Sequence, residues 1–275
     1  MIWLLGDVHS HFDHIAQAID AAAVKPSAVL FLGDIEAPIP LFECCHDIEA
    51  HGVEWFWIRG NHDTDTEENW ANVSDEKSMD HNIDGRVIAI DGVRIAGLGG
   101  IFRGEVWHPN IDSGKPSFAN YAEYEKAIRR DRQIKQRLSK QDLVQMQAVP
   151  SRRGAADLQD TYRTGKLLKH HSTIFPADYE RLADQKADIL ITHEAPSCHP
   201  HGFEQIDLLA QAMGATVFHG HHHDALDYSR HWDTLGIKAF GVGFCGITDQ
   251  DGNVIAPGDF DEHRRYREQY GMRPE

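Results

Sequence analysis

The sequence has no long apolar run, and no stretch approaches the roughly 18 residues that a membrane-spanning helix needs. Its first residues, Met1 to Gly6, run directly into a strand-like stretch without the basic start and cleavage site of a secretory signal. Cysteine is also scarce. The four cysteines lack zinc-type or redox-type spacing and are expected to be buried thiols. We therefore expect a cytoplasmic protein that does not associate with membranes.

Positive charge is in deficit as well, because 27 Lys and Arg face 43 Asp and Glu and give a formal net charge of −16. This charge argues against a protein that coats nucleic acid over its whole surface, since phosphate-backbone binding depends on Lys and Arg. Residues 115–170 differ, with 13 Lys and Arg against 6 Asp and Glu. The sequence also lacks internal repeats and low-complexity linkers. We expect one domain over residues 1–275, with residues 115–170 as a helical insertion or cap.

Short apolar runs alternate with stretches of helical spacing in the N-terminal part of the chain, a pattern typical of parallel strands joined by helices. Three runs are predicted strands: 2–5, 29–32 and 53–58. Asp91-Gly92 lies between the next two apolar runs and predicts a tight hairpin, where the chain changes to antiparallel strands. Later elements are expected as strands at 189–191 and 216–218, a helix near 203–213, and antiparallel strands around 236–243 and the Asp251-Gly252 turn.

Polar clusters follow five of the predicted strands. They are Asp7-Val8-His9, Gly33-Asp34, Gly60-Asn61-His62-Asp63, His193 and Gly220-His221-His222-His223. Ligands of open α/β sheets bind beyond the carboxyl ends of the strands, so we expect these clusters on one rim. A single cluster of this kind is more often a capping feature than a metal site, but five in order predict a metal site. Their nitrogen and oxygen ligands suit Mn, Fe, Co, Ni or Zn, and no cysteine is placed to join them.

This order of motifs resembles the five-motif pattern of the calcineurin-like metallophosphoesterases, over Gly6 to His223. The resemblance implies an α/β fold in which two β-sheets pack as a sandwich flanked by helices, in four layers αββα. It also implies two divalent metal ions. One would be held by Asp7, His9, Asp34 and His223, and the other by Asn61, His193, His221 and the bridging Asp34. No organic cofactor is predicted.

The same resemblance implies hydrolysis of a phosphate ester by a hydroxide that bridges the two metals. His62 would lie beside the metals without binding them, and would protonate the leaving oxygen or stabilise the developing charge. Several phosphatases of the family orient this histidine with a carboxylate three residues after the bridging aspartate, but Ala37 occupies that position here. Asp63, Asp65 or Glu36 could take the role, and a histidine without an acidic partner is the alternative.

Some segments resemble the RNA lariat debranching branch of the family, which implies a phosphodiesterase. They are Gly33–Ala37, Gly92–Arg103, Ser172–Phe175 and Asp188–His193. Debranching enzymes usually have cysteine in the place of Asp7, so a different substrate stays open. Arg103 follows a strand in a Gly-rich segment and could grip a phosphate, with a surface salt bridge as the competing interpretation. The basic insertion favours a nucleotide or RNA substrate, and an oligomerisation surface is its alternative use.

Three functions therefore remain open. The favoured one is a dinuclear metal-dependent phosphodiesterase, and a lariat-debranching-like 2′-5′ phosphodiesterase or nuclease is the alternative. A non-catalytic metal-binding scaffold is the alternative of another class, but such a protein would be expected to lose ligands or His62. Two further expectations concern packing: His222 should point away from the site if its segment is extended, and Trp55 and Trp57 should lie in the core.

Overall fold

A computed structural model describes residues 1–110, 116–137 and 165–258 of the chain. Two five-stranded sheets form the body, with the strand orders β10-β9-β1-β2-β3 and β4-β5-β6-β7-β8. The first sheet contains β1 (Ile2–Leu5), β2 (Ala28–Phe31), β3 (Glu54–Trp57), β9 (Ile247–Asp249) and β10 (Val254–Ala256). The second contains β4 (Val87–Ile90), β5 (Val93–Leu98), β6 (Ile189–Thr192), β7 (Thr216–His219) and β8 (Ala239–Gly241).

Alternating side chains give each sheet two apolar faces. In β1, Ile2 and Leu4 lie in the cluster between the two sheets, together with Ile191 of β6. Trp3 and Leu5 lie in a second cluster, on the opposite face of the same sheet. Trp55 and Trp57 of β3 belong to this outer cluster and are fully buried, which confirms their predicted place in the core. The fold is thus the predicted α/β sandwich of two sheets flanked by helices.

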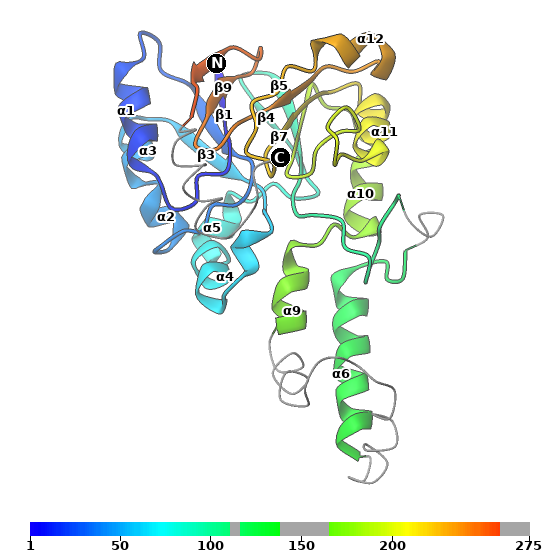
Figure 1. Cartoon of the computed structure of the whole chain (residues 1–275). Coiled ribbons are helices and arrows are strands. Elements are labelled where there is room, and N and C mark those ends of the chain that lie inside the picture. The colour runs from blue at the N-terminus through cyan, green and yellow to red at the C-terminus, as the bar shows by residue number, and fades with distance from the viewer. Residues whose placement is uncertain (111–115, 138–164, 259–275) are drawn as a thin grey trace.

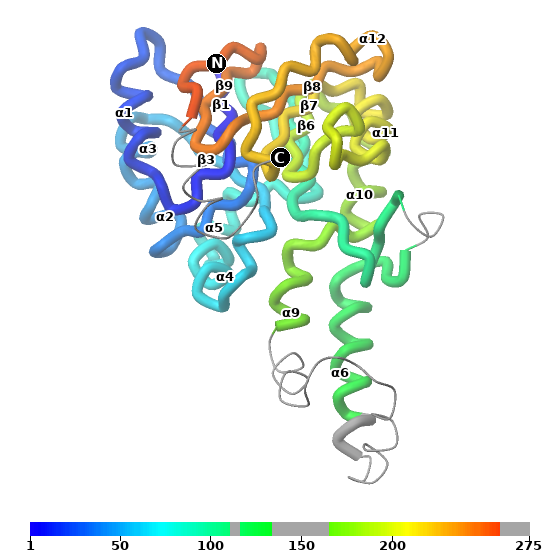
Figure 2. The backbone as a smooth tube through the Cα atoms, viewed as in Figure 1, coloured from blue at the N-terminus to red at the C-terminus, as the bar shows by residue number. Residues whose placement is uncertain are grey.

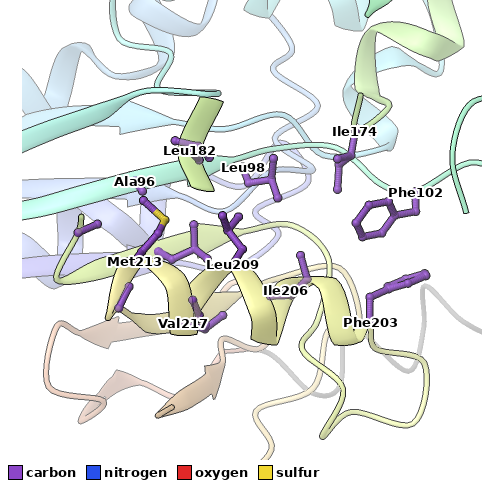
Figure 3. Close-up of a cluster of buried hydrophobic side chains, with 14 of the residues drawn as sticks. Ala96, Leu98, Phe102, Ile174, Leu182, Phe203, Ile206, Leu209, Met213 and Val217 are labelled. Atoms are coloured by element: carbon purple, nitrogen blue, oxygen red, sulfur yellow. The ribbon is translucent and has the colours of Figure 1, made fainter. Parts of the chain in front are cut away.

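Helices cover the two outer faces (Figure 1). The N-terminal half contributes α1 (Asp13–Ala21), α2 (Leu41–Cys44), α3 (His46–Ala50), α4 (Glu67–Val73) and α5 (Glu76–Asp80). The C-terminal half contributes α10 (Pro176–Ala183), α11 (Glu204–Met213) and α12 (Trp232–Leu235). Figure 3 shows Leu209 and Met213 of α11 in the buried cluster with Ala96 of β5. Their four-residue spacing places both on the face of α11 that meets the second sheet.

The tight hairpin is confirmed, but the direction of the strands that follow it is not. Asp91 and Gly92 both have positive φ, and Ile90 pairs antiparallel with Val93 across them. The strands on either side of Asp251-Gly252, β9 and β10, are also antiparallel, as expected. However, β5, β6, β7 and β8 run parallel to one another, so the change to antiparallel strands is limited to the β4–β5 hairpin in this sheet, and the antiparallel prediction is wrong for 236–243, where β8 lies. Crossovers that contain α10, α11 and α12 return the chain to the same end of the sheet each time.

The described parts of the predicted insertion are helical. α6 (Tyr121–Arg137) and α9 (Lys166–Lys169) project away from the sheets, whereas residues 138–164 lie outside the described residues (Figures 1 and 2). The ring of His171, in the short turn η4 (His170–Ser172), stacks on Trp70 of α4 at 4.5 Å and on Tyr121 of α6 at 4.3 Å. This contact fixes the base of the insertion to the body. Within the described ranges, no helix is long and apolar enough to cross a membrane.

Candidate metal centre

The predicted ligands lie in loops that follow the carboxyl ends of parallel strands in both sheets. β1, β2 and β3 lead to Asp7, His9, Asp34 and Asn61, and β6 and β7 of the second sheet lead to His193, His221 and His223. The loops are joined by backbone contacts, since the N–H of His9 donates to the carbonyl of Asp34 at 3.0 Å. Two groups of side chains result.

The first group consists of His9, Asp34 and His223, which are all buried and have ligand atoms within 4.8 Å of one another. The Nε2 atoms of His9 and His223 are 3.1 Å apart. The other ring nitrogen of His9 lies 2.5 Å from Oε2 of Glu36, so Nδ1–H donates to this carboxylate. Nε2 of His9 then carries the lone pair that a metal ion requires.

The second group consists of Asp34, His193 and His221. Nδ1–H of the fully buried His193 donates to the carbonyl of Leu32 at 2.8 Å, which leaves Nε2 as the ligand atom. This Nε2 lies 3.2 Å from Oδ1 of Asn61 and 3.3 Å from Oδ2 of Asp34. Asp34 is therefore shared by both groups.

Two carboxylate oxygens in this region are buried without a hydrogen-bond donor among the described residues: Oδ2 of Asp34 and Oδ2 of Asp7. Their partner oxygens accept backbone N–H groups, from His62 at 2.8 Å and from His221 at 3.0 Å. Asp7 joins neither group of three, although its Oδ1 is 3.7 Å from Nδ1 of His193. A buried unpaired carboxylate oxygen is costly, so these side chains fit the binding of cations.

Electrostatics supports the same fit. Burial raises the pKa of Asp7 to about 6. Burial alone would also raise the pKa of Asp34, but His193 and the other surrounding histidines hold it well below its usual range. His193 responds in the opposite sense: burial would lower its pKa, but Asp34 and Asp7 raise it to about 10. The carboxylates thus draw positive charge into a site with little access to water.

Four of the seven predicted ligands have left-handed backbone conformations, which are uncommon outside glycine. They are His9 (φ 39°), Asp34 (48°), His221 (72°) and His223 (62°). Strain of this kind gathers at functional sites. Close backbone approach adds to it: a Cβ on Gly60 would lie 2.0 Å from the backbone nitrogen of Asp34, so only glycine fits beside this residue.

His62 has an acidic partner, and the partner is Asp65. Nδ1 of His62 lies 2.6 Å from Oδ2 of Asp65, across the 3₁₀ turn η1 (His62–Thr64), in which side chains three apart eclipse each other. Burial would lower the pKa of His62, but Asp65 and Asp34 raise it to about 9. Asp63 is fully buried and accepts the N–H groups of Ile35, Glu36 and Gly60 instead. It shapes the loop that carries Asp34.

Other side chains fall in places that the motifs did not indicate. Glu194, directly after His193, is buried and accepts the N–H of Phe102 at 2.9 Å, and burial raises its pKa to about 7. With His221 and His222 it forms a third group within 4.8 Å. The segment around His222 is not extended, and its ring stacks on His199 at 3.8 Å. Only the position of Glu194 beside a motif could have drawn attention to it.

Arg103 has no carboxylate within ion-pair distance among the described residues, so the structure does not show the competing salt bridge. Its Nη2 donates to Oγ of Ser172 at 2.9 Å. Ser172 in turn lies 2.6 Å from Oγ1 of Thr64, in the η1 turn that follows Asn61. The base of the insertion is therefore connected to the edge of the candidate metal centre.

A two-sheet αββα fold with Asp and His groups at the strand ends is an arrangement suited to a metal-dependent hydrolase. The sequence profile of the calcineurin-like phosphoesterases matches residues 1–225, so the chain belongs to this family and is a phosphoric ester hydrolase. Members of the family generally use two divalent metal ions. An uncharacterized protein of Haemophilus influenzae is 34% identical over 256 residues, covering 93% of this chain and 96% of the relative. A phosphopantetheinyl hydrolase structure from Mycobacterium tuberculosis aligns over 88% of this chain and 89% of its own, with 14% identity and a TM-score of 0.41.

Proposed function

We propose that this chain is a two-metal phosphodiesterase in which Asp34 bridges the two ions. The observation that carries the proposal is that Asp34 belongs to both ligand groups. Asp7, His9 and His223 would complete one ion's ligands, and Asn61, His193 and His221 those of the other. Nitrogen and oxygen ligands without cysteine suit Mn, Fe, Co, Ni or Zn, and they do not single out one metal.

Two ions bound here would lower the pKa of water, hold the phosphoryl oxygens and stabilise an in-line displacement. The chain's own residues orient the reacting groups. Glu36 and the Leu32 carbonyl fix the rings of His9 and His193 through their Nδ1–H groups. Asp65 likewise holds Nδ1–H of His62, so Nε2 of His62 is the atom that delivers a proton to the leaving oxygen.

A diester is preferred over a monoester for two reasons. The segments Gly92–Arg103 and Asp188–His193 resemble the debranching branch of the family, and the base of the insertion borders the centre on the side of Thr64. An RNA substrate, cleaved by a nuclease or a 2′-5′ phosphodiesterase, is favoured by the exposed Arg129 and Arg130 on α6. A non-catalytic scaffold is disfavoured because all seven ligands and His62 are retained.

The test is turnover of bis-p-nitrophenyl phosphate and p-nitrophenyl phosphate by protein loaded with Mn²⁺, Fe²⁺, Co²⁺, Ni²⁺ or Zn²⁺. We expect faster hydrolysis of the diester and loss of both metals and activity in Asp34→Asn, because Asp34 alone contributes to both groups. Asp188→Asn, at an exposed position, is the matched control and should keep both. Two metal equivalents and normal turnover in Asp34→Asn would contradict the bridging role. Tight binding of a protein partner without hydrolysis of any ester would favour the scaffold.

A further inference from the structure

A cavity of about 300 Å³ lies beside the candidate metal centre. Asn61, Thr64 and Asp65 line it from the body, and Leu168 and Lys169 of α9 line it from the insertion. Asn61 is a proposed metal ligand, and Asp65 is the partner of His62. The cavity therefore borders both the proposed metal ligands and the His62–Asp65 pair.

Arg103 lines the same cavity, and its guanidinium forms no ion pair with any described residue, although carboxylates such as Glu194 act on it from a greater distance. Its Nε is buried and has no hydrogen-bond partner among the described residues, and Nη2 is bound only to the neutral Ser172 hydroxyl. Burial lowers the pKa of Arg103, the direction expected of a cation held away from water. Unused donors of a buried guanidinium are costly, and an anion that accepts them forms strong charge-assisted hydrogen bonds.

Lys169, the last residue of α9, adds a second cation. In the described part of the chain it forms no ion pair, whereas the neighbouring Lys166 lies 3.8 Å from Glu105. The one acidic side chain lining the cavity, Asp65, is engaged by His62. The chain directly after Lys169 is held to the body, because Arg59 donates to the His171 carbonyl and Thr64 bonds Ser172. The cavity therefore carries net positive charge.

We propose that this cavity is a second anion subsite, which binds a phosphate group on the leaving-group side of the scissile ester. The inference rests on the proposed function, and it narrows the substrate to compounds with two phosphates close together. Nε of Arg103 and the ammonium of Lys169 would hold the second phosphate while the first lies at the metal centre. This phosphate could belong to a small bisphosphorylated nucleoside or to the next linkage of an oligonucleotide.

The experiment compares kcat/KM for substrates that differ only in a second phosphate. Suitable pairs, all of them diesters, are the methyl ester of thymidine 5′-phosphate with and without a 3′-phosphate, and the dinucleotide TpT with and without a terminal phosphate. We expect the wild-type protein to prefer the phosphorylated member. Arg103→Gln and Lys169→Gln should each reduce that preference by about 10-fold or more, the usual effect of losing a hydrogen bond to a charged group. Equilibrium binding of the same pairs, measured by calorimetry, should change in parallel.

Lys25→Gln is the matched control, since it removes one exposed positive charge at the opposite end of β2 and should leave the preference unchanged. An unchanged preference in both cavity variants overturns the subsite while the phosphoesterase assignment stands. Absence of hydrolysis of every ester would instead reject the proposed function. If the cavity variants lose the preference only with oligonucleotides, the second phosphate is the neighbouring linkage of the chain. If they lose it with the bisphosphorylated nucleoside, the second phosphate belongs to a small molecule. Lys169 is exposed, so its variant tests the proposal even if Arg103→Gln fails to fold.

Discussion

At the scale of single residues, His62 and Asp65 form a hydrogen-bonded pair that has a counterpart at the surface. His51 lies 2.7 Å from Asp20 in the same kind of contact, and neither residue is a predicted ligand. We expect His62→Ala to keep both metals and to lose about 10²- to 10⁴-fold in kcat, the usual contribution of a general acid. Steady-state kinetics and metal analysis of the purified variant measure the two effects separately.

A comparison of esters with different leaving groups tests whether His62 donates a proton. Esters of p-nitrophenol leave readily without one, so the loss in His62→Ala should be smaller for them than for alkyl esters. Asp65→Asn should show the same pattern in weaker form, because a neutral amide replaces the carboxylate that orients the ring and raises its pKa. His51→Ala should change neither kcat nor the leaving-group dependence. Equal losses for both ester types would reject proton donation and leave only electrostatic stabilisation.

At the scale of elements, a buried ion pair joins β3 to the turn before β4. Arg59 follows β3 and bonds Asp84 at 2.5 Å, with side chains that are 19% and 6% exposed. The Arg94–Asp188 pair is similar in chemistry, but its side chains are 49% and 47% exposed. We expect Arg59→Ala to lower the free energy of unfolding by about 3–5 kcal/mol, because the buried carboxylate of Asp84 is left without a positive partner and keeps the neutral donor Asn82.

The exposed pair supplies the control for this prediction. Arg94→Ala should cost about 0–1 kcal/mol, since water screens an exposed pair. Urea unfolding of both variants, followed by circular dichroism, gives the two values. Similar losses in the two variants would show that burial does not set the strength of the Arg59 pair. The Arg59 variant should also loosen η4, because Arg59 donates to the carbonyl of His171.

The helix α6 gives a second prediction at this scale. Arg129, Arg130 and Arg132 are exposed on it, and Arg129 pairs with Glu125. Reversal of these three residues to Glu should raise KM for an oligonucleotide and leave a small ester nearly unaffected, if the insertion steers polyanions. The effect should weaken as salt rises, because charges more than about 8–10 Å apart are screened at 0.1–0.15 M ionic strength.

A control for the steering prediction reverses three exposed lysines on the body: Lys25, Lys186 and Lys238. This variant has the same net charge as the α6 variant and should keep oligonucleotide KM close to the wild-type value. Unchanged oligonucleotide kinetics at low salt in the α6 variant would contradict steering. The helix would then be better explained as an oligomerisation surface, which size-exclusion chromatography of both variants would reveal.

At the scale of the whole molecule, the sequence predicted what depends on local pattern. Apolar runs followed by Asp, Asn and His placed the candidate ligands at strand ends, because strand and loop are adjacent in the chain. The partner of His62 could not be chosen from Asp63, Asp65 and Glu36, since the first two are both close to it in sequence and Glu36 follows another strand, and only the 3₁₀ turn decides which carboxylate faces the ring. The direction of β8 was also beyond local pattern, because it depends on where the crossover through α12 returns the chain.

Contacts between distant residues were equally out of reach. The stacking of His171 between Trp70 and Tyr121 joins three segments separated by 50 to 101 positions, and no spacing rule connects them. The pairing of Arg103 with Ser172 and the cavity beside it depend on the same packing. Local sequence pattern therefore placed the candidate metal ligands but not the side chains that line the neighbouring cavity.

Each ligand group draws on both sheets: His9 and Asp34 follow strands of the first, whereas His193, His221 and His223 follow strands of the second. An ion held by such a group would link the two halves of the sandwich, so the folded state should become more stable as free metal rises. For each ion the gain is about 1.4 kcal/mol per tenfold excess over its dissociation constant. Thermal melting across a metal titration should show this dependence in the wild type and lose it in Asp34→Asn. Equal melting temperatures with and without a chelator would contradict it. If melting does depend on metal, the supply of metal determines how long the chain survives proteolysis as well as how fast it hydrolyses an ester.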